Sequence, residues 1–273
     1  MDWKDIVIPA LIFAGLGLLL GAALAIASRI FAVREDERIG KIAEILPGAN
    51  CGGCGYSGCE ALARAIVRGE AAPHSCAVGG NEVARKIGAV MGVEVGDTVR
   101  MRAQVMCSGA HGTANLKYQY VGAQDCWAAA KLGGGDKMCP SGCIGLGSCA
   151  AACPFGAIQV RNGLAEIDRD GCRGCGVCLT HCPQHIIRLI PYDARYWVAC
   201  QSVESGKTTR QQCQAGCISC HLCEKNCPAG AIHVDNFVAS IQQGLCTGCG
   251  RCAEKCPRHI IHMADGHAAI PTA

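Results

Sequence analysis

The sequence predicts an α+β fold that follows a single N-terminal transmembrane helix, and three observations support this prediction. An apolar segment without charged residues runs from residue 6 to residue 28. The chain contains 24 cysteines, most of them in closely spaced runs. One pattern of cysteines occurs twice, because Cys143 and the cysteines after it recur 74 positions later, from Cys217 onward. Short helices and strands between such runs are typical of small α+β modules.

Composition narrows the classes of function. The net charge is only +3, and no basic stretch is interleaved with aromatic residues, so nucleic acid is not an expected partner. Aromatic residues make up 4% of the chain, which leaves little bulky material for an ordinary core. We therefore expect bound groups to hold much of the chain together and its partners to be proteins.

Residues 1–30 are predicted to be a membrane anchor. The 23 residues from Ile6 to Ser28 are long enough as a helix to cross a bilayer. Lys4 stands alone before the segment, whereas four basic residues follow it: Arg29, Arg34, Arg38 and Lys41. By the positive-inside rule, we expect a single-pass protein of the cell inner (plasma) membrane with its bulk on the cytoplasmic side. A buried core helix and a signal peptide cleaved after Ala25-Ile26-Ala27 are the alternatives.

Residues 31–92 are predicted to form a small four-cysteine [4Fe-4S] domain. Its candidate ligands are Cys51, Cys54, Cys59 and Cys76. The glycines between them would let the backbone wrap closely around a cluster. We expect helices over residues 60–67 and 81–92, followed by a strand over residues 93–105. A zinc site is the alternative, since four cysteines do not by themselves select a metal.

Two tandem modules follow, predicted at residues 93–190 and 191–273. Their cysteines lie in C-x-x-C-x-x-C-x-x-x-C-P runs, a spacing that suits iron-sulfur clusters rather than disulfides. The first copy contains Cys143, Cys149, Cys153, Cys172, Cys175, Cys178 and Cys182, and the second contains Cys217, Cys223, Cys227, Cys246, Cys249, Cys252 and Cys256, together with Cys220. Each copy therefore has the layout of a two-cluster, bacterial-type ferredoxin.

In this layout the cysteine before each proline binds the cluster of the other run. The second copy should hold one cluster on Cys217, Cys220, Cys223 and Cys256 and another on Cys246, Cys249, Cys252 and Cys227. The first copy should hold one on Cys172, Cys175, Cys178 and Cys153. Its other cluster has only Cys143, Cys149 and Cys182, because Leu146 stands where the second copy has Cys220.

Five further cysteines lie outside the regular runs: Cys107, Cys126, Cys139, Cys200 and Cys213. One of them could complete the defective cluster, and the other four could hold another. We expect Cys139 to be the substitute, because it is only four residues from Cys143, and Cys107 is the alternative. Either assignment gives six [4Fe-4S] clusters, of which four rest on regular runs. A three-ligand [3Fe-4S] cluster with several free thiols is a further possibility.

Other motifs carry no predicted chemistry. Residues 145–150 fit G-x-G-x-x-A but lie inside a cysteine run, so we do not interpret them as a dinucleotide site. Gly206-Lys207-Thr208 lacks the first glycine of a P-loop, and we expect a hairpin turn there. No catalytic triad, paired-carboxylate motif or flavin-attachment motif is present. We expect no catalytic site in this chain.

The combination resembles a known family. An N-terminal membrane helix, the segment LPGANCGGCGYSGC at residues 46–59 with Cys76 after it, and tandem ferredoxin motifs are similar to the RnfB family of iron-sulfur subunits of the Rnf complex. That complex is a membrane-bound ferredoxin:NAD+ oxidoreductase (translocase), and the resemblance covers essentially the whole chain. It implies that the chain relays electrons from soluble ferredoxin to other subunits, both membrane subunits and a flavin-containing, NAD-reducing one. Those partners would couple the transfer to Na+ or H+ export.

Two other functions remain open at this point. The chain could be a membrane-tethered iron-sulfur reductant of a redox regulator, or the iron-sulfur subunit of a non-pumping dehydrogenase. In all three cases it transfers electrons through clusters and performs no chemistry on a bound substrate.

Overall fold

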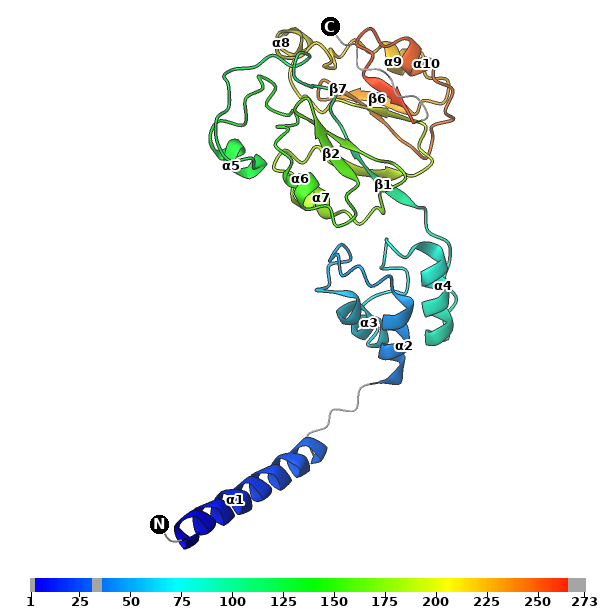
Figure 1. The fold of residues 1–273 in the computed structure, drawn as a ribbon. Coiled ribbons are helices and arrows are strands. Elements are labelled where there is room, and N and C mark those ends of the chain that lie inside the picture. Colours follow the sequence, from blue (N-terminus) through cyan, green and yellow to red (C-terminus); the bar gives the residue numbers. More distant parts are fainter. Residues whose placement is uncertain (1–2, 31–35, 265–273) are drawn as a thin grey trace.

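The computed structural model describes residues 3–30 and 36–264 (Figure 1). Helix α1 (Trp3–Ile30) contains the predicted apolar segment and is a few residues longer at each end. Residues 11–29 of this helix have a mean hydropathy of 2.3, and none of them is buried in the protein. Among the described residues, α1 is the one helix that is long and apolar enough to cross a membrane. The large apolar side chains that this helix exposes include Leu18 and Phe13.

Three helices form the small domain that begins at residue 36. They are α2 (Glu37–Ile45), α3 (Cys59–Val67) and α4 (Gly80–Met91), so the two helices expected after Cys59 are present. Each presents one apolar face, and the faces meet in a core where Ile42, Leu62, Ile66 and Ile87 are at most 1% exposed. This core is small, and it lies directly beside the cysteine loop at residues 51–59, which it supports.

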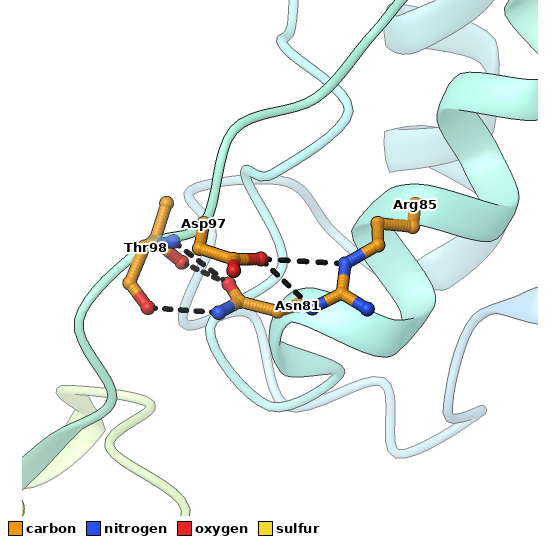
Figure 2. A network of polar contacts seen from close by, with 4 residues as sticks. All are labelled: Asn81, Arg85, Asp97 and Thr98. Carbon is orange, nitrogen blue, oxygen red and sulfur yellow. Dashed lines mark hydrogen bonds and ion pairs between the residues drawn. The ribbon is translucent and has the colours of Figure 1, made fainter.

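The connection to the first repeat is extended but mostly not a strand. We expected a strand over residues 93–105, whereas β1 comprises only Met101–Val105. Asp97 and Thr98, which precede β1, instead form polar contacts with side chains of α4 (Figure 2). The Asn81 side chain accepts hydrogen bonds from the Thr98 amide (2.9 Å) and hydroxyl (2.7 Å) and donates to its carbonyl (3.1 Å), while Arg85 pairs with Asp97. These contacts take the place of the backbone hydrogen bonds that a strand would have made, and they attach the connection to the small domain.

The first repeat consists of two antiparallel pairs of strands with one-turn helices between them. Strand β1 pairs with β4 (Ile187–Pro191), and β2 (Ile158–Arg161) pairs with β3 (Leu164–Ile167). Helices α6 (Ser148–Ala151) and α7 (Val177–Thr180) each follow a cysteine loop. Helix α5 (Cys126–Lys131) lies in the segment upstream of the regular cysteine runs.

The second repeat has the same plan. Strand β5 (Tyr196–Val198) pairs with β8 (Ile261–Met263), and β6 (Ile232–Asp235) pairs with β7 (Val238–Ile241). Helices α9 (Leu222–Lys225) and α10 (Arg251–Glu254) correspond to α6 and α7. The mixed helix and strand content agrees with the predicted class. In both repeats the buried core includes cysteines, for example Cys149, Cys178, Cys223 and Cys252.

One local prediction is wrong. The expected hairpin turn at Gly206 is the start of helix α8 (Gly206–Gln212). Ser205 caps this helix, because its hydroxyl accepts a hydrogen bond from the Thr208 amide (3.3 Å). The helix has no helical counterpart in the first repeat, where α5 occupies an earlier position in the segment.

Candidate metal centres

The structure groups all 24 cysteines into six sets of four, and we number them in spatial order. The sets are site 1 (Cys51, Cys54, Cys59, Cys76), site 2 (Cys153, Cys172, Cys175, Cys178), site 3 (Cys126, Cys143, Cys149, Cys182), site 4 (Cys107, Cys139, Cys200, Cys213), site 5 (Cys217, Cys220, Cys223, Cys256) and site 6 (Cys227, Cys246, Cys249, Cys252). Sites 1 and 3–6 each line a hollow of about 330–380 Å³, including its opening to solvent.

Site 1 lies in the loop in front of α3. Asn50 adopts a left-handed backbone conformation (φ 45°), and its side-chain oxygen accepts a hydrogen bond from the Cys59 amide (2.8 Å). This bond ties the start of the loop to the start of the helix, so that Cys51 and Cys54 face Cys59. Cys76 also lines this hollow, and Cys175 of site 2 borders it.

Sites 2, 5 and 6 have the compositions expected from the crossing-cysteine pattern. In each of the two repeats, a residue in the left-handed region precedes each one-turn helix, such as Gly176 before α7 and His221 before α9. This conformation turns the chain sharply, so the next cysteine enters the helix and points back at the loop. In site 6, the Cys227 sulfur also accepts a hydrogen bond from the Ala231 amide (3.3 Å).

Site 3 corrects the predicted ligand assignment. Neither Cys139 nor Cys107 joins Cys143, Cys149 and Cys182, because the fourth cysteine of this hollow is Cys126. Leu146, which stands at the position of the expected ligand, packs against the small buried cluster of Cys126, Ala129 and Ile144. The substitute cysteine and the leucine at the regular ligand position therefore belong to the same packing cluster.

Local capping explains why Cys126 reaches site 3. Asp125 caps α5 by accepting a hydrogen bond from the Ala128 amide (2.7 Å), and its other oxygen accepts one from the Ser148 hydroxyl (2.9 Å). The Ser148 oxygen in turn accepts a hydrogen bond from the Cys126 amide (2.7 Å). Since Ser148 begins α6 and precedes Cys149, these bonds hold the starts of α5 and α6 together. In the second repeat, Ala199 and Leu222 stand at the corresponding positions and cannot form this link.

Site 4 lies between the two repeats and takes cysteines from both. The Cys107 sulfur accepts a hydrogen bond from the Gly109 amide (3.2 Å), and the Cys200 sulfur accepts one from the Cys217 amide of site 5 (3.3 Å). Cys126 and Cys200 occupy equivalent positions in the repeats but belong to different sites. The four cysteines therefore match neither set that the sequence suggested.

Burial makes isolated thiolates unfavourable at these sites. Burial raises the pKa of several thiols above the usual value of 9.0, among them Cys143, Cys213 and Cys252 to about 11 and Cys149, Cys178, Cys200 and Cys223 to about 12. Charges on neighbouring cysteines raise them further. Such thiols keep their protons near neutral pH unless bound metal replaces the protons.

The donor sets fit iron-sulfur clusters better than single ions. All four donors at each site are sulfur atoms, which suit clusters or zinc. In the described part of the chain, however, no three or more His, Cys, Asp or Glu side chains lie close enough to hold one metal ion. Each set of four thiols instead surrounds a common centre, as the ligands of a group of several atoms would.

Family models agree with this interpretation. Residues 46–78 match a model described as "Putative Fe-S cluster". Three models described as "4Fe-4S dicluster domain" match residues 135–183, 171–231 and 216–261. Cys107 and Cys126 lie outside all four matches, so these models do not account for sites 3 and 4 completely.

Three curated proteins are similar over most of the chain, and each is named as the B-type subunit of a complex. The one from the "ion-translocating oxidoreductase complex" of Methanosarcina acetivorans is 42% identical over 85% of this chain and 88% of its own length. The one from the "Na(+)-translocating ferredoxin:NAD(+) oxidoreductase complex" of Acetobacterium woodii is 42% identical over 86% of this chain and 71% of its own length. The one from the "proton-translocating ferredoxin:NAD(+) oxidoreductase complex" of Clostridium ljungdahlii is 37% identical, with shares of 84% and 82%.

Proposed function

Because the chain belongs to the family of B-type subunits of ion-translocating oxidoreductase complexes, we propose that it relays electrons from reduced ferredoxin towards NAD+. The family and the 4Fe-4S domains make it an iron-sulfur electron-transfer subunit. In this proposal, flavin-containing and membrane-embedded subunits reduce NAD+ and couple the transfer to translocation of Na+ or H+. The chain itself binds the clusters and holds them in order.

We assign one [4Fe-4S] cluster to each of the six sites, with the four cysteines of each site as ligands. When bound, each cluster accepts and releases one electron. The chain supplies sulfur donors, hydrogen bonds to those sulfurs and a surrounding of low polarity. The amide groups of Gly109, Cys217 and Ala231, which donate to cysteine sulfurs, would stabilise negative charge on the reduced clusters.

The observation that carries this proposal is the continuous series of neighbouring cysteines. Cys51 of site 1 adds to the raised pKa of Cys175 in site 2, after the larger effect of burial. In the same way Cys178 of site 2 is influenced by Cys149 of site 3. The series continues from site 3 to site 4, where Cys107 adds to the raised pKa of Cys143 after burial.

The last two steps lie in the second repeat. Cys200 of site 4 and Cys217 of site 5 are joined by the amide-to-sulfur hydrogen bond (3.3 Å). Site 6 shares the second repeat with site 5 in the two-cluster layout. We propose that electrons follow this order, so that an electron that reaches site 5 passes sites 4, 3 and 2 before site 1.

We propose that electrons enter at the second repeat and leave at site 1. Cys220 of site 5 and Cys249 of site 6 are exposed, whereas the cysteines of sites 2, 3 and 4 are buried or half-buried. Exposed ligands suit the docking of a soluble donor. Site 1 belongs to the domain that follows α1, which supports transfer from there to subunits in the membrane, with the basic residues after α1 on the cytoplasmic side.

Two measurements test the proposal. Anaerobically purified protein should contain about 24 Fe per chain, the content expected for six four-iron clusters. A reproducible content near 20 Fe with a [3Fe-4S] signal in electron paramagnetic resonance (EPR) would reject the six-cluster assignment. Reduced ferredoxin should bleach the visible absorbance of the protein in stopped-flow mixing; absence of bleaching would reject ferredoxin as the donor.

A further inference from the structure

Lys137 is a buried cation between sites 3 and 4. Its side chain is 3% exposed, although lysine is rarely buried unless it is paired. The Nζ atom donates three hydrogen bonds, to the carbonyl oxygens of Gly109 (2.7 Å), Cys143 (2.7 Å) and Gly163 (2.5 Å). Three acceptors match the three N–H groups of an ammonium ion, whereas a neutral amine has only two.

These hydrogen bonds place the charge against both sites. Cys143 is a ligand of site 3. Gly109 follows Cys107 of site 4 and donates its amide to that sulfur (3.2 Å), and Lys137 also borders the hollow of site 4. Gly163 lies in the turn between β2 and β3, behind site 3. The Lys137 side chain therefore links the three segments that contain Gly109, Cys143 and Gly163, next to sites 3 and 4.

Among the residues that the structure describes, no acidic side chain pairs with Lys137. All three acceptors are uncharged carbonyl groups, and within residues 36–264 Lys137 has no ion pair. The adjacent Asp136 has its Oδ2 atom 3.4 Å from His111 Nε2 instead. Burying an uncompensated charge is costly, so the environment must supply negative charge in another form. The candidates in contact with this region are the cysteine sulfurs of sites 3 and 4 and what they bind.

The second repeat lacks this cation. Gln211 stands at the position equivalent to Lys137, and it is exposed. Two-cluster modules therefore do not need a lysine here in order to fold. A lysine occupies this position in the first repeat only. It lies between sites 4 and 3, where an electron would pass from one repeat to the other.

We infer that Lys137 is a positioning residue whose fixed positive charge raises the reduction potentials of the clusters at sites 3 and 4. This inference rests on the proposed function. One electron arrives from reduced ferredoxin by way of site 5 and leaves for site 2, with no bond formed or broken. The ammonium group stabilises the extra negative charge while the electron is at site 4 or site 3. Electron transfer between the repeats is therefore not the least favourable step of the relay.

The test is an EPR-monitored redox titration of full-length variants. Lys137→Met keeps the length of the side chain and removes the charge, Lys137→Arg keeps the charge, and Lys131→Met removes an exposed charge at the end of α5. In Lys137→Met we expect the ratio of reduced to oxidised clusters at sites 3 and 4 to fall about tenfold at a fixed potential, or about 59 mV for a one-electron couple. The reduction potentials of the other four clusters in Lys137→Met should match those of the parent protein. All six potentials should be unchanged in Lys137→Arg and Lys131→Met. The signal of site 3 is identified separately with Cys126→Ser.

Three results would overturn the inference. The first is an unchanged titration of Lys137→Met at full iron content. The second is an equal shift in Lys137→Arg. The third is loss of iron in both Lys137→Met and Lys137→Gln, which would make the lysine a structural clamp only. Failure of the proposed function is distinguishable, because the parent protein itself would then lack the expected iron or would not be reduced by ferredoxin.

Discussion

Gly53 lies so close to Cys175 that a methyl group at position 53 would overlap the Cys175 carbonyl oxygen. The two residues belong to site 1 and site 2, and this is the contact through which the small domain meets the first repeat at its cysteines. Electron tunnelling weakens steeply with distance, so the bare glycine brings the two sites as close as their backbones permit. The contact is thus a packing feature with a direct consequence for the relay.

Gly53→Ala should separate sites 1 and 2. Because the obstacle is backbone rather than a flexible side chain, the domains must move apart, at a cost of about 1–3 kcal/mol. We expect faster amide hydrogen exchange at residues 51–54 and 172–176 and weaker magnetic coupling between two clusters by EPR, with unchanged iron content. Gly96→Ala is the control, since a Cβ there meets nothing within 4 Å. Equal exchange in both variants would contradict the close contact.

Cys126→Ser should remove one ligand of site 3. We expect the [4Fe-4S] cluster to become [3Fe-4S], with about one Fe lost per chain and a new signal in the oxidised protein. Leu146→Cys in the Cys126→Ser background should restore the four-iron cluster, because Leu146 packs against the packing cluster that contains Cys126 and occupies the regular ligand position of the repeat.

Cys139→Ser is the matched comparison for that experiment. It should alter site 4, and Leu146→Cys should not repair it. Rescue of Cys139→Ser by Leu146→Cys, together with an unaffected Cys126→Ser, would restore the assignment suggested by sequence proximity.

Much of the site could be predicted from the sequence because the regular cysteine runs are local. A run of C-x-x-C-x-x-C places three sulfurs around one loop, and the cysteine before the proline of the other run supplies the fourth. The same reasoning predicted α3 and α4 from their apolar spacing. These features depend on residues that are near in sequence or related by the repeat.

The assignment of Cys126 failed because it depends on tertiary structure. Proximity in sequence favoured Cys139, whereas Cys126 is held at site 3 because its amide donates to Ser148, whose hydroxyl donates to Asp125. A signal was present, since Asp125 and Ser148 have no polar counterparts at positions 199 and 222. Nothing local, by contrast, could show that Thr98 is held by Asn81 rather than by a neighbouring strand.

Asn81→Ala should loosen the connection between the small domain and β1. The Asn81 side chain makes three hydrogen bonds with Thr98, so we expect a loss of about 1–2 kcal/mol in the local stability of residues 93–100. Asp97→Ala removes only an exposed ion pair with Arg85 and should cost less than about 0.5 kcal/mol. Hydrogen exchange of the Thr98 amide measures both. A larger effect of Asp97→Ala would reverse the ranking of the two contacts.

His262 should make the second repeat less stable in mild acid. Burial lowers the pKa of this histidine below its usual 6.5, and its Nε2 atom is hydrogen-bonded to the Ser108 hydroxyl (2.8 Å), which joins β8 to the loop after Cys107. The unfolded chain therefore binds a proton near pH 6.5 that the folded chain does not, so stability is full above pH 6.5 and declines as the pH falls below it. The urea concentration that halves the visible iron-sulfur absorbance should fall more between pH 7.5 and 5.5 in the parent than in His262→Gln. Equal declines would show that other groups, such as the clusters themselves, cause the acid sensitivity.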